Sequence, residues 1–373
     1  MKKVFLVATL LFTSAAFAGD VTTVVVYQKD GEFAGWPANE GLWTWGDEML
    51  VAFEVAAFVE TEGDHSVNRD SPRRIVFSRS MDGGRTWAAE EHPEIAPPEY
   101  LGDAEKHRQE GRTPARPSPG GFDFEDPDFI MKLRGGAFYI SKNRGRGWEG
   151  PYLLPSFNYI SEARTSYMAT GKDSCLLFMT GRVARGGLKY GRSCVLQTAD
   201  GGKTFGFLSW IGDDIGEKPG GGGAGGALFS IMPSAVRLDD GRYICAVRQR
   251  MNKAKWTDIF ESGDGCKTWR KISVLEKGSA NPASLVLMSD GRIAAIYGNR
   301  RKSPCGVAAK ISADHGRTWS GEMTLRNDAR KWDIGYTRAA QRPDGKIVAL
   351  YYYTTKEIPH NFIAASIWAP GGK

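Results

Sequence analysis

The sequence has few of the residues that build metal and redox sites. Its 373 residues include five cysteines and five histidines. The cysteines are Cys175, Cys194, Cys245, Cys266 and Cys305. They show no metal-ligand spacing, and an odd number leaves at least one unpaired. We therefore expect buried thiols rather than a disulfide framework, with Cys175 and Cys194 as the one pair to test for a bridge, and we expect neither a metal nor another cofactor.

Three further absences exclude other classes of protein. The glycine run at 220–226 follows no strand-helix pattern and has no Lys-Ser/Thr partner, which argues against a phosphate-binding loop. No basic run is present to track a nucleic-acid backbone, so a nucleic-acid partner is not expected. After residue 18 no apolar segment is long enough to span a membrane.

The first 18 residues have the order of a secretory signal. Lys2 and Lys3 precede an apolar run from Val4 to Phe12, and small residues close the segment at Ala16 to Ala18. Removing the two lysines takes the formal net charge from +6 to +4. We expect residues 1–18 to be a signal peptide, residues 19–373 to form one domain, and the mature protein to be secreted or periplasmic.

An eight-residue repeat organises the rest of the chain. The pattern Ser/Thr-x-Asp-x-Gly-x-Thr-Trp/Phe occurs at 80–87, 198–205, 262–269 and 312–319, with a degenerate copy at 141–148. Each copy follows a β-rich run. Its Asp and Ser/Thr can bond the backbone of a tight turn, its Gly accepts positive φ, and its aromatic residue anchors the turn. The repeat therefore predicts strand-to-strand turns and no chemistry of its own.

These copies resemble the Asp-boxes, or BNR repeats, of the sialidase superfamily of β-propellers. The resemblance implies an all-β fold of four-stranded antiparallel blades, with the boxes on the face opposite the active site. Hairpin turns mark six units, and they lie at 46–47, 135–136, 172–173, 240–241, 290–291 and 344–345. The last unit has no box, so we expect the N-terminal run at 21–27 to supply its outer strand. The sequence predicts six blades, or seven if the long first unit splits.

Counting back about eight residues from each hairpin turn lands near the start of the innermost strand of each unit. The residues found there include Asn39 and Glu40, Arg164 and Tyr167, Met232, and Tyr336 with Arg338. The end of the following antiparallel strand lies on the same face and adds His65, Arg182, Arg248 and Arg300. We therefore expect one mouth rich in arginine and tyrosine, which suits a carboxylated sugar because guanidinium pairs with carboxylate.

The resemblance implies roles for some of these residues. Sialidases use three arginines at the substrate carboxylate, a Tyr-Glu pair as nucleophile and an Asp as proton carrier. Tyr336 matches the nucleophile, and Arg248, Arg300 and Asp64 or Asp70 match the other roles. Gly35-Trp36-Pro37 stands where those enzymes begin with Arg-Ile-Pro, and Met232 stands where the Glu is expected.

Uronate lyases of similar fold imply a second set of roles. They need a His/Tyr pair and an arginine beside the uronate, and His65, Tyr167, Arg164 and Arg182 match that set. We place Tyr167 and Tyr336 at equivalent strand starts, both facing the mouth.

The sequence thus predicts an exported protein that cleaves a glycosidic bond beside an acidic sugar. Because the first arginine and the Glu are missing, uronate β-elimination is slightly favoured over sialidase-type hydrolysis. Its partner would be an acidic oligo- or polysaccharide. The alternative from another class is a glycan-binding propeller without catalysis, which would keep the arginine-rich mouth and be indifferent to the loss of His65 and Tyr167.

Overall fold

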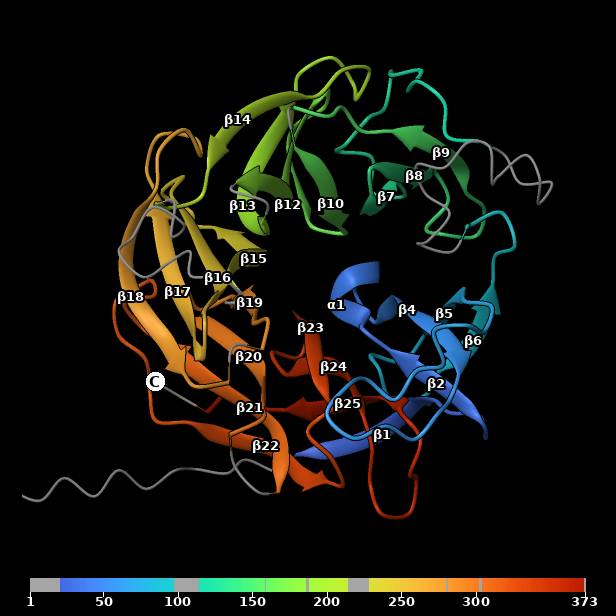
Figure 1. The fold of residues 1–373 in the computed structure, drawn as a ribbon. Coiled ribbons are helices and arrows are strands. Elements are labelled where there is room, and N and C mark those ends of the chain that lie inside the picture. The colour runs from blue at the N-terminus through green and yellow to red at the C-terminus, as the bar shows by residue number, and fades with distance from the viewer. Residues whose placement is uncertain are drawn as a thin grey trace, which may run out of the picture.

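The computed structural model describes residues 21–96, 114–157, 159–185, 188–213, 228–279, 281–301 and 304–371. The segment expected to be a signal peptide, residues 1–18, and the glycine run at 220–226 lie outside this part of the chain. Nearly all regular structure is β-strand, and the strands surround a central axis (Figure 1). No helix in the described ranges is long and apolar enough to cross a membrane.

The described strands pair into six antiparallel groups. In the first, β2 (Glu32–Gly35) and β3 (Gly41–Trp45) both pair with β4 (Glu48–Ala57), followed by β5 (Arg74–Ser80) and β6 (Ala88–Glu91). The second is β7 (Ile130–Gly135), β8 (Ala137–Ser141) and β9 (Glu149–Leu153). In the third, β10 (Ile160–Arg164) and β11 (Tyr167–Gly171) both pair with β12 (Ser174–Arg185), followed by β13 (Leu188–Thr198) and β14 (Gly206–Trp210).

The remaining three groups follow the same plan. The fourth is β15 (Leu228–Arg237), β16 (Tyr243–Met251), β17 (Ala254–Ser262) and β18 (Arg270–Lys277). The fifth is β19 (Ser284–Leu287), β20 (Ile293–Asn299), β21 (Cys305–Ser312) and β22 (Met323–Ala329). The sixth is β23 (Gly335–Gln341), β24 (Ile347–Tyr353), β25 (Phe362–Trp368) and β1 (Thr22–Tyr27). Additional pairing of β7 with β10 and of β13 with β15 makes the second, third and fourth groups continuous.

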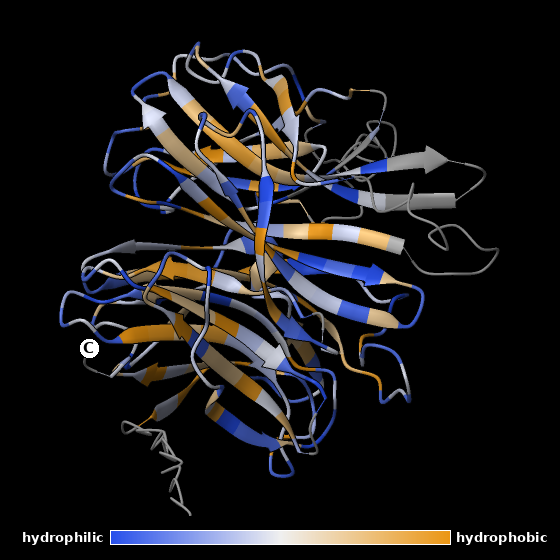
Figure 2. Cartoon of the chain, turned by 90° about the vertical axis from the view of Figure 1, so that its left-hand side faces the viewer, coloured by the Kyte–Doolittle hydropathy of each residue, from blue (hydrophilic) through white to orange (hydrophobic). Residues whose placement is uncertain are grey.

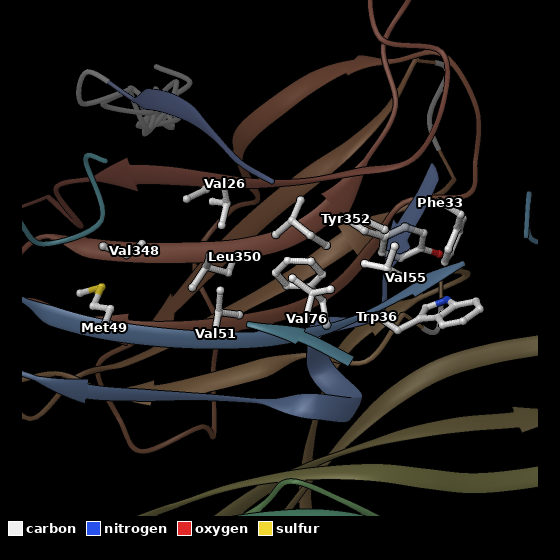
Figure 3. Close-up of a cluster of buried hydrophobic side chains, with 14 of the residues drawn as sticks. Val26, Phe33, Trp36, Met49, Val51, Val55, Val76, Val348, Leu350 and Tyr352 are labelled. Atoms are coloured by element: carbon white, nitrogen blue, oxygen red, sulfur yellow. The ribbon is translucent and has the colours of Figure 1, made fainter. Parts of the chain in front are cut away.

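The N-terminal strand completes the last group, as the sequence predicted. β1 pairs antiparallel with β25, from Thr22 opposite Ile367 to Tyr27 opposite Ile363. This pairing joins the two ends of the described chain and covers the edge that β25 would otherwise expose. Its apolar side chain Val26 lies in the same core cluster as Val348 and Leu350 of β24 (Figure 3).

Each group shares a hydrophobic core with the next. The cluster in Figure 3 joins the sixth and first groups, and the other clusters join the first to the second, the second to the third, and so on around the axis. Figure 2 shows apolar residues along the strands and hydrophilic residues at many of the loops. Burial of apolar surface between neighbouring groups thus holds the ring together.

The repeated motif forms the turn between the last two strands of its group. In the copy at 80–87, Ser80 Oγ bonds Asp82 Oδ1 at 2.8 Å and accepts from Gly84 N at 2.8 Å. Asp82 also accepts from Thr86 N at 2.9 Å and from Thr86 Oγ1 at 2.7 Å. The copies at 198–205, 262–269 and 312–319 repeat the bonds from the threonine to the aspartate. The motif residues are therefore occupied with turn structure.

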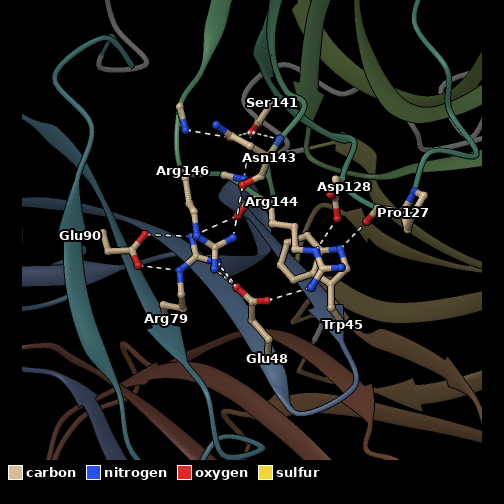
Figure 4. A network of polar contacts seen from close by, with 12 residues as sticks. Trp45, Glu48, Arg79, Glu90, Pro127, Asp128, Ser141, Asn143, Arg144 and Arg146 are labelled. Atoms are coloured by element: carbon tan, nitrogen blue, oxygen red, sulfur yellow. Dashed lines mark hydrogen bonds and ion pairs between the residues drawn. The ribbon is translucent and has the colours of Figure 1, made fainter.

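An ion-pair network ties the first group to the second (Figure 4). Glu48 contacts Arg79 at 2.7 Å, Arg144 at 3.2 Å and Arg146 at 2.9 Å, while Glu90 contacts Arg79 at 2.6 Å. Each arginine here has a carboxylate partner, so this charged cluster is a structural joint.

The five cysteines are free thiols, so the pair singled out for a possible bridge is not joined. Burial raises the pKa of Cys175 and of Cys194 to about 12, which keeps both thiols protonated and unreactive at neutral pH.

Candidate functional site

Three inner strands are interrupted by a bulky residue with positive φ. Trp36 (φ 58°) precedes the short helix α1 (Pro37–Glu40), which lies between β2 and β3. Met232 (φ 58°) lies at a register shift in β15, and Tyr336 (φ 50°) lies at a register shift in β23. Non-glycine residues rarely adopt this conformation, and when they do it is held by surrounding structure, often at functional sites. Tyr336 packs against the cluster that contains Met232 and against the cluster that contains Trp36. The interruptions therefore direct side chains from separate groups toward one place.

Tyr336 is surrounded by arginines. Arg248 Nη1 donates to the Tyr336 hydroxyl oxygen at 3.1 Å, and the guanidinium carbons of Arg248 and Arg300 each lie 5.7 Å from the centre of its ring. Burial by itself raises the pKa of Tyr336, but the positive charges of Arg248, Arg300 and Arg164 outweigh burial and hold that pKa below its ordinary value. We call Tyr336, Arg164, Arg248 and Arg300 the tyrosine–arginine cluster.

Two arginines of this cluster, Arg248 and Arg300, are held by rings, a sulfur atom, a carbonyl and a hydroxyl. Arg248 lies over the ring of Phe229 at 5.0 Å, with Nη1 3.7 Å from the sulfur of Met232. Arg300 donates to the carbonyl oxygen of Ile334 at 2.7 and 3.1 Å and to the Tyr352 hydroxyl at 2.8 Å. None of these contacts is with a carboxylate.

Arg164 is oriented by an amide. Its Nε donates to Asn39 Oδ1 at 2.6 Å, and its Nη1 is 4.0 Å from Glu162 Oε2. Burial, despite attraction by Glu162, lowers the pKa of Arg164 to about 10, so the side chain is still charged at neutral pH. Asn39, which the sequence predicted to bind substrate, thus contacts Arg164 and positions it.

His65 belongs to a second hydrogen-bonded unit beside the cluster. Its Nδ1 is 2.5 Å from Asp333 Oδ1, and the same oxygen accepts from the Tyr352 hydroxyl at 2.5 Å. Asp333 Oδ2 accepts from Ser66 N at 3.1 Å. Burial alone raises the pKa of Asp333, but its bonds to His65 and Tyr352 and the charge of Arg300 hold it below the ordinary value. Because Nδ1 is occupied, a proton exchanged with a ligand must pass through Nε2 of His65.

Aromatic rings line this unit. The His65 ring centre lies 5.2 Å from Trp36, 5.7 Å from Trp332 and 6.3 Å from Tyr336. Rings at these separations present apolar faces of the kind that pack against a pyranose. His65 and the tyrosine–arginine cluster therefore share one aromatic-walled region.

Tyr167 does not lie there. Its hydroxyl accepts from Met131 N at 3.1 Å, its ring packs in the cores that join the second group to its neighbours, and burial raises its pKa. In the third group the position equivalent to Tyr336 is Arg164. The following residues, Thr165 and Thr337, each donate Oγ1 to an inner carbonyl of the preceding group. The prediction that Tyr167 and Tyr336 occupy equivalent places was wrong, because Tyr336 lies eight residues before its hairpin turn at Asp344, whereas Tyr167 lies only five before its turn at Lys172.

The other predicted residues have structural partners. Glu40 is fully buried and contacts Lys132 Nζ at 2.5 Å and Arg134 at 3.3 Å. Arg182 Nε donates to Glu162 Oε1 at 2.6 Å. Arg338 donates to the carbonyl oxygens of Ala38, at 2.8 Å, and of Thr165. Glu40 therefore stabilises a buried ion-pair network, and the structure does not bring its carboxylate to Tyr336.

Sequence reasoning missed Asp333 and Trp332. Both lie in the loop before β23, within four residues of Tyr336, and this proximity was the available signal. In the described part of the chain, no three His, Cys, Asp or Glu side chains are grouped so that they could hold a metal ion.

Comparison of structures finds the same fold in several proteins. A protein of unknown function from Dyadobacter fermentans is 20% identical over 93% of this chain and 98% of that one, with a TM-score of 0.67. The NanB sialidase of Streptococcus pneumoniae is 12% identical over 93% and 70%, with a TM-score of 0.57. The α-L-arabinanase of Penicillium chrysogenum is 11% identical over 93% and 98%, with a TM-score of 0.58. At these identities the likeness shows the fold alone.

Comparison of sequences identifies the family. No curated protein sequence matches the chain. The model of the BNR repeat-like domain, however, matches residues 135–349, more than half of the 373 residues. This range includes copies of the repeated motif together with Arg164, Arg248, Arg300 and Tyr336. The chain therefore belongs to the family of BNR repeat-like domains.

Proposed function

We propose that this protein binds a carboxylated sugar at the tyrosine–arginine cluster and cleaves the glycosidic bond beside it, with Tyr336 and His65 as the reacting groups. The observation that carries the proposal is the hydrogen bond from Arg248 to Tyr336, in a setting that holds the Tyr336 pKa below its ordinary value. A phenol that ionises more readily is a better nucleophile and a better base near neutral pH. The same arginines are the natural partners of a sugar carboxylate.

The proposal takes the six strand groups as the blades of a six-bladed propeller and the region around Tyr336 as its mouth. The ring of shared cores and the similarity to sialidase and arabinanase folds support this interpretation. Export by the N-terminal segment is part of the proposal, since large acidic glycans occur outside the cytoplasm.

Hydrolysis through Tyr336 is the route that this geometry supports best. The phenolate oxygen would attack the anomeric carbon while His65 Nε2 gives a proton to the departing oxygen, and water would then release the sugar from Tyr336. Two features that counted against this route in the sequence have substitutes in the structure. Arg164 provides a third arginine although Gly35-Trp36-Pro37 replaces the Arg-Ile-Pro segment, and the arginine charges lower the Tyr336 pKa although Met232 occupies the place of the Glu.

Uronate β-elimination is the second candidate, and the bond between His65 and Asp333 favours it. His65 Nε2 would remove the C5 proton, the arginines would neutralise the carboxylate, and Tyr336 would return a proton to the leaving oxygen. The pair originally predicted for this reaction, His65 with Tyr167, lacks support because Tyr167 is packed between groups. Tyr336 replaces it.

Matched tyrosine variants test the proposal. The purified protein is incubated with sialosides and with uronate polysaccharides, and both free sugar and the near-ultraviolet absorbance of an unsaturated uronate are recorded. Tyr336→Phe should lower turnover by roughly 10²- to 10⁴-fold while binding is retained. Tyr167→Phe, the control, should keep its turnover once shown to be folded. Equal effects of the two variants would contradict the assignment, and full binding without turnover in the wild type would indicate a glycan-binding module.

A further inference from the structure

A small cavity lies on the central axis, next to the mouth. Its walls come from the inner segments of several groups and include Ala38, Glu162, Arg164, Thr180, Met232 and Arg338. Tyr336, His65, Arg248 and Arg300 do not line it. The cavity measures about 20 Å³, which is room for one or two water-sized particles. A sugar ring is far too large to enter.

Two arginines bring unpaired hydrogen-bond donors to this cavity. The Nη1 of Arg164 and the Nε of Arg338 are buried and have no hydrogen-bond partner. The other bonds of these two guanidinium groups go to neutral acceptors, the amide oxygen of Asn39 and the carbonyl oxygens of Ala38 and Thr165. A buried donor without a partner destabilises the fold, and the effect is larger when the donor is charged.

Nearby carboxylates do not balance this charge. Glu162 uses Oε1 for Arg182 at 2.6 Å, and its Oε2, which is also buried without a hydrogen-bond partner, makes only a long ion pair of 4.0 Å with Arg164 Nη1. Glu40 is engaged with Lys132 and Arg134. Burial, together with repulsion by Arg164, lowers the pKa of Arg338 to about 10, so the group remains protonated at neutral pH. The cavity is therefore bordered by more positive than negative charge.

We propose that this cavity binds one monatomic anion of the halide class, such as chloride, between Arg164 and Arg338. The size of the cavity selects a single small ion over sulfate or a carboxylated sugar, and the unpaired donors supply its hydrogen bonds. The ion would offset the repulsion between the two arginines. This inference does not depend on the reaction proposed above.

Bromide locates the site directly. Crystals of the full chain are soaked in sodium bromide, and anomalous scattering is measured at the bromine absorption edge. The expected result is a peak within hydrogen-bond distance of Arg164 Nη1 and Arg338 Nε. A map with bromide peaks elsewhere and none in this cavity would overturn the proposal, and this measurement needs no variant to fold.

Thermal unfolding gives an independent test in solution. Sodium chloride replaces sodium methanesulfonate at constant ionic strength, since methanesulfonate is too large for the cavity. Chloride should raise Tm in a saturable way, by about 1–3 °C. Arg338→Met should abolish this response. Arg301→Met, the control, removes an arginine that is paired with Glu322 outside the cavity and should keep it. Equal Tm values in the two salts would refute the site.

Discussion

Replacement of Arg248 by Met should make Tyr336 harder to ionise. Arg248 donates to the Tyr336 hydroxyl oxygen at 3.1 Å. Burial raises the Tyr336 pKa, three arginine charges lower it, and the charge of Arg248 has the largest effect of the three. Methionine keeps an unbranched apolar stem beside Phe229 and Met232 but removes both the charge and the donor. The phenolate would then lose its main stabilising partner.

The size of the effect follows from the type of bond. A hydrogen bond to a charged group contributes roughly 1.5–3 kcal/mol, which corresponds to a roughly 10- to 150-fold fall in the acid dissociation constant of Tyr336. Because Tyr336 is only partly buried, screening by solvent favours the lower half of this range. Arg164 and Arg300 remain in the variant and keep part of the stabilisation.

Two measurements follow the ionisation. The phenolate absorbance of Tyr336 is obtained as the difference between titrations of the protein and of Tyr336→Phe, and it should move to higher pH in Arg248→Met. If Tyr336 reacts as a phenolate, kcat/KM rises with pH as the phenol ionises, so the rising limb of the pH profile should move to higher pH as well.

Arg250→Met is the matched control. Arg250 lies two residues further along β16, and its Nε donates to the carbonyl oxygen of Asn252. Loss of the Arg250 side chain should leave the pH at which Tyr336 ionises unchanged. An unchanged titration in Arg248→Met, or equal shifts in the two variants, would refute the claim that a specific arginine activates Tyr336.

Three further predictions concern His65, the motif turns and the closing strand. Asp333→Asn should lower turnover roughly 10²-fold. Because the pKa of Asp333 is depressed in the folded protein, the same substitution should lower the free energy of unfolding measured in urea at pH 7, and the difference from wild type should narrow as pH falls below about 4. The bond from Thr268 helps lower the pKa of Asp264 to about 2, so Asp264→Ala should be less stable at neutral pH and nearly equal to wild type below pH 2; a constant difference in acid titrations would contradict this. Replacing residues 21–27 by a Gly/Ser segment of equal length should lower Tm and increase aggregation, because the edge of β25 becomes unpaired; an unchanged Tm would argue against closure by β1.

Local chemistry in the sequence was sufficient to predict the β-framework. The motif at 80–87 carries its own hydrogen-bonding groups, so its turn could be read without knowing what packs on it. Asp240-Gly241 and Asp290-Gly291 marked hairpins for the same reason, and both hairpins are present. The run at 21–27 was assigned to the last group because a strand edge needs a partner, and β1 provides it.

The proposed reacting groups are brought together by contacts that no local pattern encodes. His65 and Asp333 are 268 residues apart, Arg164 and Asn39 are 125 apart, and Arg248 and Tyr336 are 88 apart. The sequence predicted an arginine-rich mouth because these residues lie near strand ends. It could not show which arginine bonds Tyr336, nor that Asp333 holds His65.

The error over Tyr167 shows why the tertiary structure was needed. Strand alternation assigns side chains to faces only while the register is unbroken, and Tyr167 lies beyond a break, five residues before its hairpin turn, whereas Tyr336 lies eight residues before its own. The inner strands of the third and sixth groups are both interrupted, between β10 and β11 and at Tyr336 in β23. Packing against the preceding group fixes the threonine that follows each of these residues, so Arg164, rather than Tyr167, holds the position in the third group that Tyr336 holds in the sixth. The sequence by itself determined the strands and turns, whereas the side chains that meet at the mouth were decided by how the groups pack.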